Sequence, residues 1–203
     1  MNVGIYIYDQ AEVLDFSGPF EVFSTASRIC ENDTPFNTFL VSETGQEVNA
    51  RGGYRIIPAY SFQSSPHIDL LIIAGGVHSG EMEKKPVLQW IKETSASATA
   101  VASVCTGVFL LAAAGVVTKH TVTTHWEDIG DLKAGFPDLN VQESKRWVAD
   151  ENIISSAGIS AGIDMSLHLI SILYSKKLAE KTAMQMEYHW ENSELSRPIY
   201  ENN

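Results

Sequence analysis

The stretch from Thr99 to Gly115, TAVASVCTGVFLLAAAG, constrains the fold more than any other part of the chain. It joins an apolar run typical of a buried strand to a second run that suits a helix, with Cys105 at the junction. In an α/β protein such a junction lies where the sheet places its ligands and its chemistry. Because Thr106 and Gly107 leave room for a sharp turn, the pattern predicts a nucleophile elbow. By itself it also fits a buried structural cysteine.

The size of the chain predicts one domain. With 203 residues, 44% of them apolar, it can fill one large core, which we assign to residues 1–190 with a polar tail over 191–203. The start, MNVGIYIYD, lacks a basic signal region. The longest apolar run, Val108 to Val117, is far below the ~18 residues of a membrane span. We therefore expect a cytoplasmic protein without membrane contact.

Charge and cysteine content limit the partners. A net charge of −11 without a basic cluster disfavours nucleic acids, whose phosphates would be repelled. Cys30 and Cys105 form neither a disulfide framework nor a metal-binding pair, and the histidines lack ligand spacing. We expect a protein without metal or cofactor that acts on a small molecule.

Strands alternate with helices along the chain, which predicts a three-layer α/β sandwich with a mainly parallel, flavodoxin-like sheet. In the helix after the first strand, Pro19 is expected in the first turn, which places Asp15 in the preceding loop. The expected strands are 3–8, 36–42, 70–74, 99–104 and 122–124, with a hairpin or a pair of short edge strands over 47–58 and a hairpin over 146–156. The other expected helices are 85–93, 126–136, 158–174 and 177–190.

Three loops that follow apolar strands carry polar or catalytic groups, and in this architecture they converge at one edge of the sheet. Residues 9–18 supply the carboxylate of Asp15, and residues 75–80 supply Gly75 and Gly76, whose bare N–H groups suit an oxyanion. The third loop supplies the Cys105 thiol. Together they predict a nucleophilic site with a stabiliser for developing charge.

Five segments together resemble one known family. They are LDFSGPFEVF at 14–23, IIAGG at 72–76, SVCTGVFLLAAAG at 103–115, TTHW at 123–126 and SSAGISAGIDMSLHL at 155–169. The set is similar to the ThiJ/PfpI superfamily, which has the class I glutamine amidotransferase fold. Within it, the chain most resembles the isocyanide hydratases and the ligand-binding domains of AraC-type regulators.

The resemblance implies a role for each site residue. Cys105 matches the strained elbow cysteine, and Asp15 matches the acid that hydrogen-bonds its sulfur. Gly75 and Gly76, with the N–H of Thr106, match the oxyanion pocket. The protease-like branch has a histidine directly after the cysteine, so Thr106 argues against a Cys-His peptidase.

Electrostatics adds a prediction about the proton of this pair. Two negative charges at roughly 4 Å repel by about 4 kcal/mol at an effective dielectric near 20, so a thiolate and a carboxylate should share one proton. Burial is expected to place it on Asp15, which becomes the general acid to the Cys105 nucleophile. The resemblance then implies hydration of a small isocyanide to an N-substituted formamide by a homodimer. The alternatives are a non-catalytic ligand sensor, a redox or carbonyl-stress protein and, least favoured, an amidase or protease.

Four other polar residues have a simpler interpretation. His125, in HWE, is expected to line the pocket or to satisfy a loop hydrogen bond, with a direct chemical role as the alternative. His78 follows Gly75 and Gly76 and could reach the pocket. Glu21 is the rival to Asp15 but is expected to face solvent or cap its helix. Asp164, in the first turn of its helix, is expected to be structural.

Overall fold

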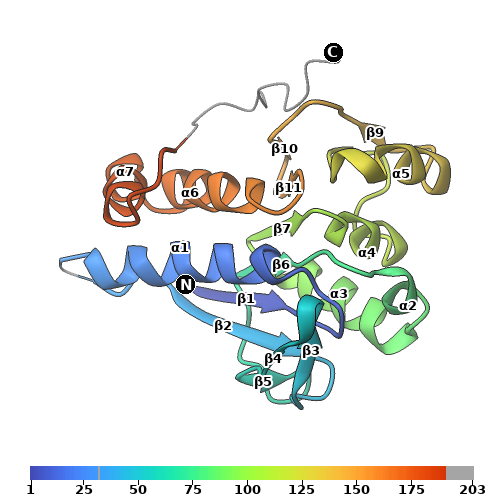
Figure 1. Cartoon of the computed structure of the whole chain (residues 1–203), viewed down its shortest axis with the longest axis horizontal. Helices are drawn as coiled ribbons and strands as arrows, with labels where there is room; N and C mark the ends of the chain where they lie inside the picture. The colour runs from blue at the N-terminus through green and yellow to red at the C-terminus, as the bar shows by residue number, and fades with distance from the viewer. Residues whose placement is uncertain (32, 191–203) are drawn as a thin grey trace.

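The central sheet of the computed structural model, which describes residues 1–31 and 33–190, has seven strands (Figure 1). They are β1 (Asn2–Tyr6), β2 (Asn37–Ser42), β5 (Tyr60–Ser61), β6 (Leu70–Ile73), β7 (Ala100–Val104), β10 (Trp147–Asp150) and β11 (Ile153–Ser156). Two small ribbons pair β3 (Val48–Ala50) with β4 (Tyr54–Ile56) and β8 (Thr121–Val122) with β9 (Asn140–Val141). The expected tail, 191–203, lies outside the described residues.

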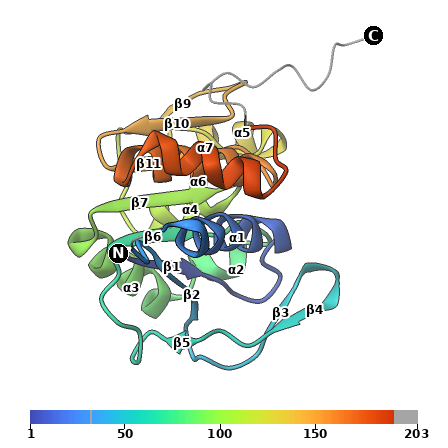
Figure 2. The same cartoon turned by 90° about the vertical axis from the view of Figure 1, so that its left-hand side faces the viewer.

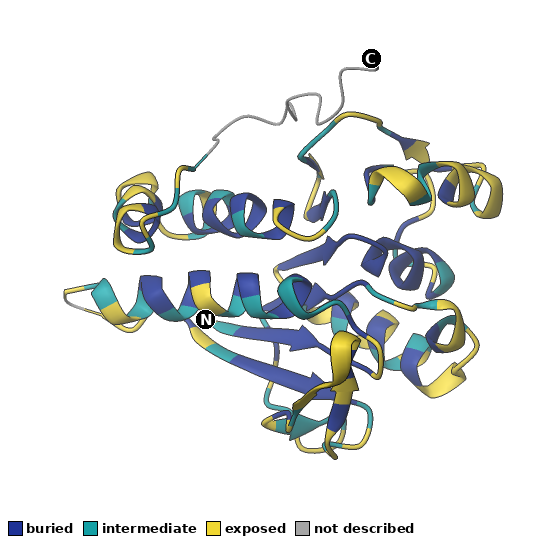
Figure 3. Cartoon of the chain, viewed as in Figure 1, coloured by how far each residue is buried: buried dark blue, intermediate teal, exposed yellow. Residues whose placement is uncertain are grey.

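The strand order is β10-β11-β7-β6-β1-β2-β5, and every neighbouring pair is parallel except β10 with β11. Every residue of the central strands β6 and β7 is buried, as expected of apolar strands that are covered on both faces (Figure 3). The mainly parallel sheet confirms the predicted fold class. It brings the carboxyl ends of β1, β6 and β7 to one edge.

Helices cover both faces of the sheet. Those described are α1 (Val13–Ile29), α2 (Ser79–Met82), α3 (Lys85–Ser97), α4 (Gly107–Ala113), α5 (Ile129–Gly135), α6 (Ala161–Leu173) and α7 (Lys176–Gln185), with short 3₁₀ turns η1 (Arg51–Gly53) and η2 (Trp126–Asp128). Helices α1, α6 and α7 pack on one another over one face, and α3 and α4 lie on the other (Figure 2). None of the helices in the described part of the chain is both long and apolar enough to span a lipid bilayer.

The placement of Asp15 differs from the prediction. Asp15 lies in the first turn of α1 and not in a loop, and Pro19 lies inside the helix and not in its first turn. The helix starts earlier because the N–H of Glu12 bonds to the Gly75 carbonyl at 2.9 Å, and the N–H of Asp15 bonds to the Glu12 carbonyl at 3.1 Å. A contact with a distant loop therefore sets the start of the helix.

Two predicted helices are shorter than expected. The last one ends at Gln185 and not at Trp190, because Glu187 takes a positive φ of 50° and the Tyr188 N–H bonds back to the Ala183 carbonyl at 2.9 Å. The expected helix from Trp126 to Phe136 is a 3₁₀ turn followed by α5. Both predicted hairpins form, with Glu151 at the tip of the second at a φ of 56°.

Candidate active site

Cys105 lies directly after β7 with a positive φ of 55°, a strained value for a residue that is not glycine. Hydrogen bonds hold this conformation. The Cys105 N–H is shared between the carbonyls of Ser156 and Ala157 at 3.2 and 3.3 Å, and the Thr124 hydroxyl donates to the Cys105 carbonyl at 2.9 Å. The sharp turn predicted from the sequence is therefore present, and the thiol is held at the edge of the sheet.

Two glycines allow the close approach of backbone that this turn needs. A Cβ on Gly107 would lie 2.2 Å from the Ile73 carbonyl oxygen. A Cβ on Gly75 would lie 2.6 Å from the Thr106 nitrogen and 2.8 Å from the Cys105 Cβ. Because real side chains do not approach so closely, both positions require glycine. The need for glycine at position 75 is therefore explained by its close packing against the turn at Cys105, and not by the exposed N–H group expected for an oxyanion pocket.

Asp15 lies beside Cys105 and is fully buried. Its Oδ2 accepts the Gly75 N–H at 3.0 Å, whereas Oδ1 is buried without a hydrogen-bond partner among the described residues. No lysine or arginine within the described residues pairs with this carboxyl group. Burial of a carboxyl group without a neighbouring cation raises its pKa, so Asp15 can take up a proton near neutral pH.

The electrostatics of the pair follow from this burial. Burial, and then the charge of Glu12, raise the pKa of Asp15 from 3.8 to about 7, although the backbone of Gly75 and Ile159 and the Cys105 side chain oppose the rise. Burial and the Asp15 charge also raise the pKa of the Cys105 thiol, while the Thr106 N–H lowers it. Loss of both protons is therefore disfavoured. Burial does not act on Asp15 alone, however, because it disfavours the thiolate as well.

The N–H groups expected to form an oxyanion pocket already have acceptors. The Gly75 N–H donates to Asp15, and the Gly76 N–H donates to the Thr106 hydroxyl oxygen at 2.9 Å. That hydroxyl in turn donates to the Gly76 carbonyl at 3.0 Å, so Thr106 ties the elbow to the glycine loop. The predicted oxyanion pocket is therefore reduced to one of its three N–H donors. In this arrangement the Thr106 N–H, which faces the Cys105 sulfur, is the donor available to a developing negative charge.

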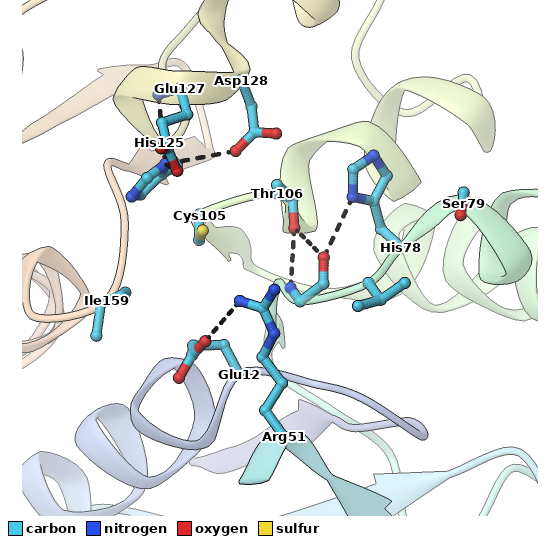
Figure 4. A pocket seen from close by; sticks show the side chains of 12 residues that line it. Glu12, Arg51, His78, Ser79, Cys105, Thr106, His125, Glu127, Asp128 and Ile159 are labelled. Atoms are coloured by element: carbon cyan, nitrogen blue, oxygen red, sulfur yellow. Dashed lines mark hydrogen bonds and ion pairs between the residues drawn. The ribbon is translucent and has the colours of Figure 1, made fainter.

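A pocket of about 330 Å³ opens above Cys105 (Figure 4). The residues that line it are Glu12, Arg51, Gly76, Val77, His78, Ser79, Cys105, Thr106, His125, Glu127, Asp128 and Ile159. Cys105 lines this pocket, whereas the fully buried Asp15 does not.

Both predicted histidines line the pocket. The His78 Nδ1 lies 3.3 Å from the Gly76 carbonyl oxygen, and its ring packs on Phe109 with 4.4 Å between the ring centroids. The His125 Nδ1 accepts the Glu127 N–H at 3.3 Å and so caps η2. These contacts agree with the expected roles of pocket lining and loop hydrogen bonding.

Sequence reasoning did not single out seven of the lining residues: Glu12, Arg51, Val77, Ser79, Glu127, Asp128 and Ile159. For Glu127 and Asp128, the TTHW segment directly before them was a usable signal. No local pattern indicated Arg51, which comes from the turn η1 between β3 and β4. Nor did any indicate Ile159, a β-branched residue with a φ of 57°, which is a strained conformation. Its neighbour Gly158 must be small, because a Cβ there would lie 2.0 Å from the His125 Cδ2.

The two other carboxylates singled out from the sequence lie away from the pocket. Glu21 is 58% exposed and lies 3.9 Å from Arg28, so it faces solvent as expected. Asp164 is fully buried and ion-paired with Arg146, which supports the structural role expected for it. Within the described residues no cluster of His, Cys, Asp and Glu could hold a metal ion.

The fold and the elbow define a class of protein: a DJ-1-like member of the class I glutamine amidotransferase fold with a cysteine at the strand-to-helix turn. The sequence comparison makes this specific, since residues 1–172 match the model of the DJ-1/PfpI family. The chain belongs to the DJ-1/PfpI family.

Individual relatives agree with this assignment. The chain is 31% identical to the isonitrile hydratase of Pseudomonas putida over 93% of its own length and 78% of the relative. It is 24% identical to the HTH-type transcriptional regulator GbdR of Pseudomonas aeruginosa and spans about half of that regulator, 48%.

Solved structures support the same fold. A ThiJ/PfpI family protein from Pseudomonas syringae superimposes with a TM-score of 0.83 at 26% identity, covering 98% of this chain and 77% of that one. Drosophila melanogaster DJ-1beta superimposes with a TM-score of 0.80 at 19% identity, covering 93% and 98%.

Proposed function

We propose that the chain is a cysteine-dependent hydratase that converts a small isocyanide into an N-substituted formamide. The observation that carries this proposal is the pairing of a strained Cys105, which lines a small pocket, with a buried Asp15 that has no cation beside it among the described residues. The 31% identity to an isonitrile hydratase over 93% of the chain supports the same chemistry. The family by itself leaves the reaction open, because one fold hosts many activities.

The first step joins the sulfur to the terminal carbon of the isocyanide. As the S–C bond forms, Asp15 takes up the thiol proton and delivers it to the same carbon, giving a thioimidate, R–N=CH–S–Cys105. A carboxyl with a pKa of about 7 suits both transfers near neutral pH. The raised pKa of the thiol is therefore compatible with attack, because the proton leaves as the bond forms.

The second step releases the product. Water adds to the thioimidate carbon, the C–S bond breaks, and the thiol regains a proton, leaving R–NH–CHO. The net reaction adds one water to one isocyanide and needs no cofactor. Thr106, which follows the cysteine, ties two loops together and does not act as a base, so the site lacks the adjacent histidine of a Cys-His peptidase.

The test is an assay for formamide with purified protein and an aryl isocyanide. Wild type should turn over, and Cys105→Ala should fall to the rate of buffer alone. Cys30→Ala is the matched control: Cys30 caps the far end of α1, lies 3.3 Å from the Tyr174 hydroxyl and does not line the pocket. Turnover that survives in Cys105→Ala would exclude the thiol from the reaction.

A further inference from the structure

We infer that the pocket above Cys105 selects substrates whose non-reacting end carries a positive charge, and that Glu127 and Asp128 hold that end. The inference rests on the proposed function for the reacting end, the isocyanide carbon. It adds the charge of the other end, which the reaction itself leaves open. A pocket of about 330 Å³ admits a short side group of this kind.

Among the side chains that line the mouth of the pocket, meaning its charged rim, three are carboxylates and one is an arginine. Arg51 and Glu12 neutralise each other, since the Arg51 Nη1 lies 3.0 Å from the Glu12 Oε2. Glu127 and Asp128 enter the pocket lining from η2, on the side opposite to this pair (Figure 4). The mouth therefore carries two carboxylates beyond the one that its arginine neutralises.

The partner of these two carboxylates is His125. Its Nδ1 lies 3.6 Å from the Glu127 Oε2 and 3.5 Å from the Asp128 Oδ2. The same Nδ1 accepts the Glu127 N–H, so in this arrangement it presents a lone pair and not a proton to both carboxylates. Within the described residues, neither carboxylate has a lysine or arginine at ion-pair distance. An ammonium group on the substrate would supply the missing positive charge.

A substrate with a negatively charged end would be disfavoured in this pocket. Arg51 is already engaged by Glu12, so a carboxylate on the substrate would have to displace that side chain. It would also face Glu127 and Asp128 across a small pocket. Like charges placed together in this way exclude a competitor without any new attractive contact. Selection by charge therefore combines attraction of cations with rejection of anions.

The effect should be moderate because solvent screens these groups. The Glu127 side chain is 64% exposed and that of Asp128 is 28% exposed. For exposed ion pairs a preference of roughly fivefold for a cationic over a neutral substrate is the expected size. The net charge of −11 adds long-range attraction that salt weakens. High ionic strength should therefore reduce the preference.

The experiment compares three isocyanides with the same three-carbon spacer. They are 3-(trimethylammonio)propyl isocyanide, its neutral isostere 4,4-dimethylpentyl isocyanide and the anionic 4-isocyanobutanoate. We expect kcat/KM to fall in that order for wild type, with roughly fivefold between cation and neutral. Glu127→Gln/Asp128→Asn should bring the cation-to-neutral ratio close to one. A wild-type ratio of one or less, or a ratio that the double variant leaves unchanged, overturns the inference.

The matched control is Asp131→Asn/Glu151→Gln, which removes the same formal charge from two exposed positions outside the pocket lining. Its ratio should equal that of wild type. If the control lowers the ratio as much as the double variant, the preference comes from the overall charge of the chain and the assignment to Glu127 and Asp128 is wrong.

Labelling of the thiol separates this inference from the proposed reaction. In a Cys30→Ala background, Cys105 is the remaining cysteine. It should react faster with a trimethylammonioethyl than with a sulfonatoethyl methanethiosulfonate, as followed by mass spectrometry. The difference should shrink in Glu127→Gln/Asp128→Asn. If no isocyanide is turned over but this difference holds, the hydratase proposal fails and the charge selection stands; equal labelling rates overturn the selection.

Discussion

Asp15 and Asp164 occupy equivalent places in two neighbouring helices and have different surroundings. Both are fully buried, and they lie in the first turns of α1 and α6, which pack against each other. Asp164 is paired with Arg146 and accepts the Tyr188 hydroxyl at 3.0 Å. Asp15 has the Gly75 N–H and no cation among the described residues.

The comparison teaches that burial and a helix N-terminus do not decide what a carboxyl group does. Helix N-termini favour an ionised carboxylate by at most about 2 kcal/mol, which is less than the cost of burying an unpaired charge. The charge of the neighbouring side chain separates the two carboxyl groups. With Arg146 beside it, Asp164 joins α6 to the residue before β10. Asp15 has no cation beside it among the described residues, and burial raises its pKa to about 7.

The largest expected effect is on the activity of Asp15→Asn. This change keeps the shape of the side chain but removes its ability to take up and deliver a proton. We expect kcat/KM for an aryl isocyanide to fall by roughly 10²–10⁴-fold, without loss of thermal stability at pH 8. Steady-state formamide assays and melting curves measure the two quantities. Full activity in Asp15→Asn would remove Asp15 from the mechanism.

The next effect is the pH dependence of stability. The unfolded chain releases the Asp15 proton near pH 3.8, whereas the folded chain holds it to about pH 7. Between these values the folded state binds more protons, so its stability should fall as pH rises, by about 4 kcal/mol at most. Urea unfolding from pH 4 to 8 should show this fall in wild type and a flatter profile in Asp15→Asn. Parallel profiles would contradict the raised pKa of Asp15.

A smaller loss of stability is expected for Asp164→Asn. It leaves the Arg146 guanidinium partly buried without its carboxylate and should lower the free energy of unfolding by about 3 kcal/mol at pH 7. Replacing both partners, Asp164→Leu with Arg146→Met, should recover part of this loss, because no charge is then buried. Equal losses in the single and double variants would show that packing, and not the ion pair, stabilises this region.

The smallest effect is expected for Glu21→Gln, in the same helix as Asp15. Because Glu21 is exposed and its contact with Arg28 is long, the free energy of unfolding should change by less than about 0.5 kcal/mol. Activity should equal that of wild type. A loss of activity comparable to that of Asp15→Asn would restore Glu21 as the rival acid.

Local sequence patterns were sufficient to predict the central strands and the loops that meet around Cys105. Apolar runs ending in Cys105 and in Gly75 predict buried parallel strands, and the loops after such strands meet at one edge of the sheet. The turn at Cys105 was predictable because the small Thr106 and Gly107 directly follow it. The position of Asp15 was only partly predictable, since its helix starts at the hydrogen bond from the Glu12 N–H to the Gly75 carbonyl, which joins segments far apart in the chain.

The sequence by itself determined the α/β class, the parallel sheet and the convergence of a thiol, a carboxyl group and a glycine pair, because these follow from periodicity and turn residues. Only the tertiary structure decided how each group is engaged. It gave the Gly75 and Gly76 N–H groups to Asp15 and Thr106. Within the part of the chain that the structure describes, it put a cation beside Asp164 but not beside Asp15. It also built the charged mouth of the pocket from η1 and η2. These are contacts between distant segments, whose electrostatics depend on burial and distance, and local sequence encodes neither.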